Sequence, residues 1–373
     1  MNKKRFLNAL MTWLAVLLPA LIAAALYFFS GADKAFSTWY ARNLYPVWVG
    51  MLGRINGWIP FSVNEIGSYL FLLLFIFFIV RDITRAVRKA VPRRWFSRWL
   101  RIVMVCVGAM SLVFMLGMGI NYNRATFAEE YAMDLSGGTK EDLYYLSEIM
   151  TEEANALAEF VVRNEEGIMQ LSGDVRSQAV SAMRELGEKY PTLSGFYPLP
   201  KPIWFSEFLS HEHITGIQSP YTSEAQYNRL ITPYNLPHTI CHELAHLKGY
   251  AREDEANFIG FLACIFSEET DMRYGGYVLG YLYASNALYG ADYDLWAKVR
   301  GKLEDIISVD LAENSRYWAQ YQTKLAEIKD KVNDAQLKFN HQEDGVKSYG
   351  RVVDLMLSFY RDEIEIRKAS NVD

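Results

Sequence analysis

Residues 238–257, HTICHELAHLKGYAREDEAN, combine histidines and acidic residues at spacings that suit metal chemistry. His242 and His246 are one helical turn apart, so their imidazoles project from the same face and can bind one ion. Glu243 directly follows the first histidine, which places its carboxylate beside the metal, where it can accept a proton. With 6 His in 373 residues, an HExxH pattern arises by chance on the order of 0.01 times. The pattern therefore predicts a Zn²⁺ site with Glu243 as the catalytic base.

The helix that carries this pattern has signals at both ends. Pro237 suits the first turn of a helix and Gly249 suits its C-terminal cap, which predicts a helix over 238–248. His238 shares the face of the other histidines, but it lies about 12 Å along the helix axis from His246. The side chains of His238 and His246 therefore cannot bind the same ion through bonds of about 2 Å. We therefore expect His238 to occupy the start of the helix.

A zinc site of this kind needs a third protein ligand and an open fourth position. After the turn at Gly249, a second helix over about 253–266 is expected to pack back on the first, along a stripe of small or short residues. Glu253 begins that stripe and faces the two histidines. Glu255 points about 200° away around the helix and is the alternative ligand. Asn257 is positioned to hydrogen-bond a ligating side chain.

HELAH followed by EDEAN resembles the gluzincin metallopeptidases, in which HExxH supplies two ligands and a glutamate of a following helix supplies the third. The resemblance implies that His242, His246 and Glu253 bind Zn²⁺ and that Glu243 is the base. It also implies a peptide or protein substrate, hydrolysed by Glu-assisted attack of zinc-bound water. Many members have Asp at the position of Asn257, so this residue departs from their pattern.

The whole chain also resembles an uncharacterised family of bacterial membrane proteins with three N-terminal spans, HELAH and a downstream SYGRVVDL, here residues 348–355. The expected reaction requires a hydrogen-bond donor for the developing oxyanion, and Tyr349 or Arg351 could supply it. The alternative is that the tyrosine is structural and the arginine forms a surface ion pair.

Other polar segments have weaker interpretations. Residues 223–234 are the best strand candidate, either as an edge to which an extended peptide adds or as a plain scaffold strand. His211 and His213 are expected to be surface residues of a loop. Cys241 and Cys264 are expected to be small buried thiols, with a disulfide as the alternative.

Three apolar runs precede this polar part of the chain. Residues 9–30 carry no charge and are long enough to span a membrane. Two further runs cover about 66–80 and 102–120, and the basic segment 81–101 separates them. A cleaved signal peptide is the alternative for the first run. These spans contain no pair of charged residues, which disfavours a transporter.

The distribution of charge predicts how the chain is oriented. The net charge is −5, but residues 81–101 carry +7 and all other residues together carry −12. An acidic body argues against nucleic acid as a partner, whereas a basic block beside an apolar run indicates the cytoplasmic side of a membrane. The N-terminus is therefore expected in the cytoplasm, and residues 122–373 on the extracytoplasmic side of a bacterial cytoplasmic membrane.

The predicted fold class is mainly α. A membrane domain, 1–121, is followed by an extracytoplasmic α-rich (α+β), gluzincin-like domain, 122–373, with a small sheet. Helical periodicity predicts amphipathic helices over 141–163 and 315–339 and a buried helix within 275–290. The predicted function is that of a membrane-anchored zinc peptidase acting on envelope or extracytoplasmic polypeptides. The alternative is a non-catalytic zinc-containing membrane sensor or envelope assembly factor.

Overall fold

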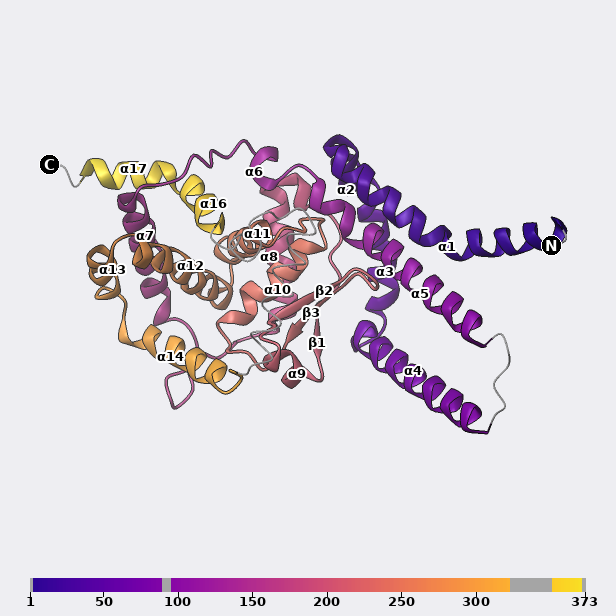
Figure 1. Cartoon of the computed structure of the whole chain (residues 1–373). Helices are drawn as coiled ribbons and strands as arrows, with labels where there is room; N and C mark the ends of the chain where they lie inside the picture. Colours follow the sequence, from indigo (N-terminus) through magenta and orange to yellow (C-terminus); the bar gives the residue numbers. More distant parts are fainter. Residues whose placement is uncertain (1–2, 89–94, 323–350, 371–373) are drawn as a thin grey trace. The chain divides into compact units, whose positions relative to one another are not determined.

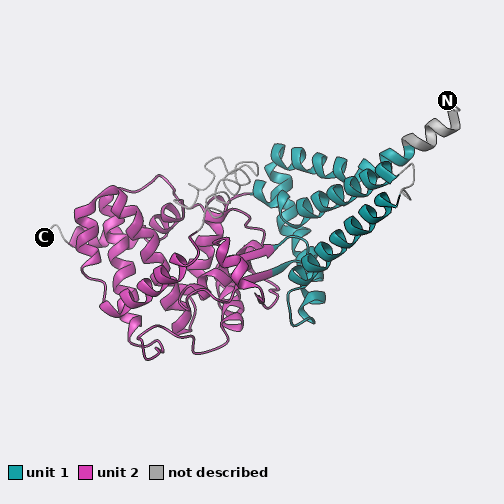
Figure 2. Cartoon of the chain, turned by 60° about the horizontal axis from the view of Figure 1, so that its bottom comes forward, with its two compact units in different colours: residues 1–124, 219–224 teal, residues 125–218, 225–373 magenta. Residues whose placement is uncertain are grey.

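The computed structural model describes residues 3–88, 95–322 and 351–370. Figure 1 shows a mainly helical chain with one small sheet, as the sequence predicted. The chain divides into two compact units, coloured in Figure 2. Unit 1 contains residues 1–124 and 219–224, and unit 2 contains residues 125–218 and 225–373.

Unit 1 contains three helices that are long and apolar enough to cross a membrane. They are α1 (Lys3–Ala32), α4 (Val63–Val87) and α5 (Trp95–Gly117). The short helices α2 (Lys34–Asn43) and α3 (Tyr45–Gly57) connect α1 to α4. Leucine and phenylalanine side chains are exposed along α4. An apolar surface of this extent requires an apolar environment such as lipid. The prediction of three N-terminal apolar helices is confirmed.

The segment 219–224 belongs to unit 1, although about a hundred residues separate it from the rest of that unit. Its Glu224 carboxylate accepts the backbone N–H groups of Val63 (3.0 Å) and Asn64 (2.8 Å) at the start of α4. A carboxylate is favoured there because the first N–H groups of a helix lack helical partners and carry partial positive charge. The predicted membrane domain, 1–121, did not include this segment.

Unit 2 is built around helices that pack on one another. Five of them pack directly on one another: α7 (Lys140–Ala158), α8 (Val175–Lys189), α10 (Asn235–His246), α11 (Glu253–Ile265) and α12 (Thr270–Ala291). The other α-helices that the structure describes in this unit are α6 (Phe127–Glu130), α9 (Ser206–His211), α13 (Tyr293–Arg300), α14 (Asp305–Ala319), α16 (Arg351–Phe359) and α17 (Arg361–Ser370). Single 3-10 turns occur at η1 (Gly119–Asn123) of unit 1 and η2 (Pro191–Leu193) of unit 2.

Two of the predicted helices differ from the structure at their ends. The helix predicted over 141–163 is α7, which ends at Ala158 because the chain then turns into a short hairpin-like bridge between Arg163 and Met169. The helix predicted over 315–339 begins earlier, as α14 at Asp305, and ends at Ala319. Residues 323–339 of that prediction lie outside the described residues. The apolar stretch 275–290 lies inside the largely buried α12, as predicted.

The sheet has three short strands in the order β1-β3-β2. Strands β1 (Lys201–Ile203) and β3 (Glu224–Asn228) pair in parallel, and β2 (Gly216–Ser219) lies on the other side of β3. The strand predicted within 223–234 is therefore β3, and of its two interpretations the scaffold strand holds and the free edge is wrong. It is the central strand, with every residue buried. The edge strands are β1 and β2.

Candidate metal centre

The two histidines of HExxH lie at the C-terminal end of α10. This helix begins at Asn235, three residues before the predicted start, and ends at His246. Gly249 has a φ of +83°, a left-handed conformation that favours glycine. This conformation allows the chain to reverse within a few residues and to begin α11 at Glu253.

Helix α11 packs closely on α10 because Gly260 has no side chain. A Cβ atom at Gly260 would lie 3.1 Å from the backbone nitrogen of His242 and 3.2 Å from the carbonyl oxygen of His238. This close approach places the first turn of α11, with Glu253, opposite the last turn of α10. This arrangement agrees with the prediction that the two helices pack along a stripe of small residues and that Glu253 faces the histidines.

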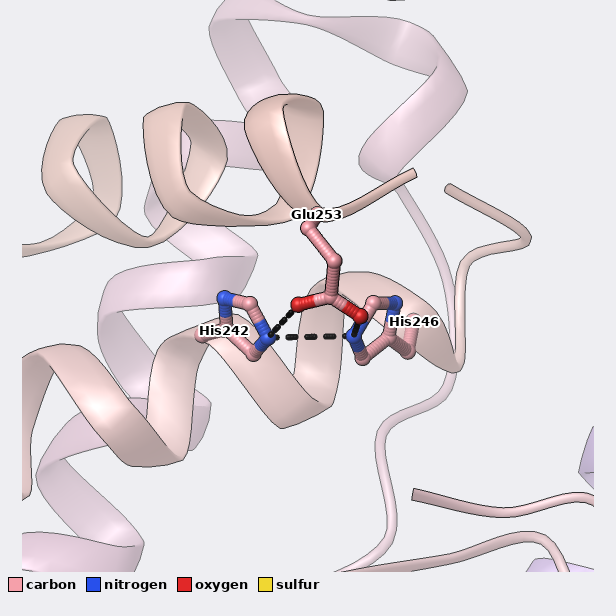
Figure 3. A group of neighbouring side chains, drawn as sticks. All are labelled: His242, His246 and Glu253. Atoms are coloured by element: carbon pink, nitrogen blue, oxygen red, sulfur yellow. Dashed lines mark hydrogen bonds and ion pairs between the residues drawn. The ribbon is translucent and has the colours of Figure 1, made fainter. Parts of the chain in front are cut away.

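Figure 3 shows that the side chains of His242, His246 and Glu253 converge. The two Nε2 atoms are 3.0 Å apart. One Glu253 oxygen lies 3.3 Å from Nε2 of His242, and the other lies 3.7 Å from Nε2 of His246. One ligand atom from each residue therefore falls within 4.8 Å of the others.

A backbone contact orients the imidazole of His246. Its Nδ1 lies 2.7 Å from the carbonyl oxygen of Tyr250. Since a carbonyl only accepts hydrogen bonds, Nδ1 carries the proton and the lone pair of Nε2 points toward Glu253. The Tyr250 hydroxyl is itself held by Glu130 (2.5 Å) and Thr192 (2.6 Å).

The chemistry of these donors fits a zinc ion. Two imidazole nitrogens and one carboxylate form the ligand set of many catalytic zinc sites, with one further position left for water or substrate. Three electron-rich atoms that meet in a buried place also need a cation or a proton between them. The His246 side chain is 5% exposed and that of Glu253 is 20% exposed, so the cluster is more open on its carboxylate side.

The opposite charges of the cluster raise the pKa of His242 and lower the pKa of Glu253. Burial lowers the pKa of His242, but Glu253, Glu243 and the Asn257 side chain outweigh burial and the pKa is raised. For Glu253, burial acts upward, yet the two histidines dominate and lower the pKa to about 2. The carboxylate is therefore held in its ionised form, which is the form that binds metals.

Glu243 is buried beside this cluster and against strand β2. A Cβ atom at Gly216 would lie 2.5 Å from Oε1 of Glu243, so only glycine leaves room for the carboxylate. Burial raises the pKa of Glu243 to about 8; His242 and the backbone N–H of Gln218 act in the opposite direction, and Glu253 adds to the increase. Oε2 of Glu243 has no hydrogen-bond partner among the described residues.

Glu255, the alternative third ligand, does not lie in this cluster. It is buried, and its carboxylate accepts a hydrogen bond from the backbone N–H of Phe127 at the start of α6. Asn257 is buried on α11 and interacts with His242 through its side chain. The backbone carbonyl oxygen of Asn257 lies 2.9 Å from Nε2 of His238. This contact places His238 between the two helices, one turn before His242.

The remaining predicted polar residues lie elsewhere. Arg351 is the first residue of α16, and its charge acts on the carboxylates of Asp254 and Asp354. Tyr349 lies outside the described residues. His211 ends α9, and Nε2 of the nearby His213 is 2.9 Å from the carbonyl oxygen of Tyr321. Cys241 and Cys264 are free and buried, as expected.

The strand that borders Glu243 was not predicted from the sequence. Gly216 and Gln218 lie more than twenty residues before HExxH, in a segment without a recognisable motif. The short run GIQS between two polar turns is the one local signal for this strand, and it does not show which helix the strand meets. Tyr250 was likewise missed, because its contact with His246 uses a backbone carbonyl.

The chain was compared with known proteins and families. It matches the model of a family described as "Protein of unknown function (DUF3810)" over residues 40–357, which include both helices of the candidate site. The match covers most of the chain, which therefore belongs to this family. No curated protein and no solved structure matches it.

Proposed function

We propose that this chain is a membrane-anchored, zinc-dependent peptidase that hydrolyses envelope or extracytoplasmic polypeptides. The observation that supports the proposal is the convergence of His242, His246 and Glu253 beside the buried carboxylate of Glu243. A structural metal site does not require a base next to its first ligand, whereas hydrolysis of an amide does.

A zinc ion held by these three residues would supply a Lewis acid that polarises a carbonyl group and makes water more acidic. Glu243 is positioned to accept the proton of the attacking water. Its raised pKa means that it holds a proton more readily than an ordinary glutamate and can pass it to the leaving amine when the C–N bond breaks.

Strand β2 is the element beside which the substrate would lie. Thr215, directly before β2, accepts the N–H of Asn228 in β3 through its carbonyl oxygen (2.8 Å), whereas the N–H that Ser219 accepts (2.9 Å) comes from Ser223 in the turn between the strands. The backbone groups of the even-numbered residues, Gly216 and Gln218, therefore point away from β3. An extended peptide added along this edge would pass Glu243.

The experiment uses the full chain in detergent micelles. The zinc content of the wild type and of Glu243→Gln is measured, and envelope proteins of cells that express either form are compared by proteomics. We expect both proteins to bind one zinc ion and only the wild type to cleave, while the exposed control Glu165→Gln behaves as the wild type. A Glu243→Gln protein that holds zinc and preserves every cleavage event would instead support a non-catalytic sensor.

A further inference from the structure

The side chain of Gln218, on edge strand β2, is buried without a hydrogen-bond partner. The residue is 6% exposed, and neither its Oε1 nor its Nε2 is bonded to any residue that the structure describes. An amide carries two donors and an acceptor, so its burial is costly unless these are satisfied. A ligand that binds here would supply the missing partners.

The position of Gln218 on the strand directs its side chain toward the candidate site. Side chains alternate between the two faces of a strand, so Gln218 and Gly216 share one face. Gly216 is in contact with Glu243, whose Cγ would lie 2.7 Å from a Cβ added at that glycine. The backbone N–H of Gln218 also acts on the Glu243 carboxylate. The unpartnered amide and the proposed base therefore lie on the same side of β2.

The chemistry of the side chain indicates what it binds. A neutral amide is satisfied at both ends by a second amide, whose C=O accepts from Nε2 while its N–H donates to Oε1. A carboxylate or an ammonium group would satisfy only one end and would bury an uncompensated charge. A peptide group offers both functions in one plane.

We propose that Gln218 is a substrate-binding residue that hydrogen-bonds a peptide group next to the bond that is cleaved. The proposal rests on the proposed peptidase function. The alternative is a structural role for Gln218. In that case a buried water molecule satisfies the amide, and Gln218 helps to hold the strand.

The stability of the ligand-free chain separates these two roles. Methionine is close to glutamine in shape and has no amide, so Gln218→Met removes the unsatisfied groups. We expect the midpoint of thermal unfolding of the full chain in detergent to rise by roughly 2–4 °C. Gln170→Met is the matched control, because Nε2 of Gln170 donates to the carbonyl oxygen of Met169 (2.9 Å), and its midpoint should fall. A fall for Gln218→Met as large as that of the control would overturn the proposal.

Ligand binding provides the second test, with the zinc-loaded full chain and two probes. Acetohydroxamate reaches a metal but has no peptide group, whereas a tripeptide hydroxamate carries peptide groups beside the same metal-binding end. We expect Gln218→Met to weaken binding of the tripeptide hydroxamate about tenfold, the effect of one lost hydrogen bond, and to leave acetohydroxamate unchanged.

Each other outcome has a separate meaning. If both compounds bind the wild type and Gln218→Met affects them equally or not at all, the inference about Gln218 fails while the metal site stands. If neither compound binds the zinc-loaded wild type, the proposed function fails and the inference fails with it.

Discussion

Two glutamates of α11, Glu253 and Glu255, are separated by a single residue but have different surroundings. The Glu253 side chain is 20% exposed and faces two imidazoles. The Glu255 carboxylate is buried and binds the first N–H of α6. A helix turns about 100° per residue, so two carboxylates at this spacing cannot face the same neighbour. One is suited to bind a metal, and the other holds two elements together.

This difference predicts opposite results for two conservative substitutions. Glu253→Gln should reduce zinc affinity by more than the roughly 10–100-fold that loss of an outer partner costs, because it removes a charged ligand. Glu255→Gln should retain zinc but lose about 1–3 kcal/mol of stability, because a charge-assisted bond to a buried N–H is weakened. Metal analysis and thermal unfolding of both purified proteins provide the measurements. Retention of zinc by Glu253→Gln and its loss from Glu255→Gln would reverse the assignment.

At the residue scale, local spacing predicted one half of the candidate site. The convergence of His242, His246 and Glu253 follows from helical periodicity over about a dozen residues and from the turn at Gly249. The β2 side of the site could not be predicted in this way. The contact of Gly216 with Glu243 depends on how a three-stranded sheet meets a helix, and no periodic signal encodes such a contact.

At the scale of elements, the spacing between α10 and α11 determines where Glu253 lies. Gly260 is in contact with the backbone of α10, which has no flexible atom that can move aside. Gly260→Ala should therefore push the helices apart by a few tenths of an ångström and cost about 1–3 kcal/mol, as overpacking does. Zinc binding, measured by titration, should weaken because the carboxylate is withdrawn from the imidazoles.

Gly290 of α12 is the matched control for this substitution. A Cβ atom there would meet nothing within 4 Å, so Gly290→Ala should stabilise the helix by about 0.5–1 kcal/mol and leave zinc binding unchanged. Equal zinc affinities for the two alanine variants would show that close packing at Gly260 does not position Glu253.

A buried ion pair connects α12 and α14 to the bridge at Arg163. Asp310, 1% exposed in its side chain, pairs with Arg163 at 3.0 Å and accepts the N–H of Met169 at 2.8 Å. It also accepts the hydroxyl group of Tyr274. Asp310→Asn would leave the Arg163 charge buried and unpaired, so we expect a loss of about 3 kcal/mol, measured as a lower midpoint of thermal unfolding.

A surface pair provides the comparison for this prediction. Lys140 pairs with Asp292 at 2.8 Å, but its side chain is 63% exposed, so Lys140→Ala should cost less than about 1 kcal/mol. Similar losses for the two variants would mean that burial does not control the strength of the Arg163–Asp310 pair. Neither ion pair was predictable from the sequence, because each joins residues more than a hundred positions apart.

At the scale of the whole molecule, hydropathy predicted the three apolar helices but not the composition of unit 1. The mean hydropathy over a window of residues detects 9–30, 66–80 and 102–120 because each is apolar throughout. It cannot detect that 219–224 joins them, since that assignment depends on the Glu224 carboxylate at the start of α4. The predicted second run was also shorter than α4, which begins at a Ser62 cap and continues through charged residues to Val87.

The side of the membrane on which unit 2 lies decides which polypeptides a peptidase of this kind would reach. The segment 81–101 carries seven arginines and one lysine, and basic loops of this kind remain in the cytoplasm. We propose that this segment lies inside; the third span would then lead out, and the candidate metal centre would lie among envelope proteins. The same reasoning predicts that the N-terminus lies inside.

Cysteine labelling tests this orientation because reaction of the native cysteines with the label can be prevented. Cys241 and Cys264 are fully buried, and Cys106→Ser removes the third. In that background a membrane-impermeant maleimide should label the exposed Glu165→Cys in cells with an intact inner membrane. Arg88→Cys, at the end of α4, should react only after lysis. The reverse pattern would place the metal centre in the cytoplasm, so that the proposed envelope substrates would be excluded while the zinc chemistry of His242, His246 and Glu253 would be unaffected.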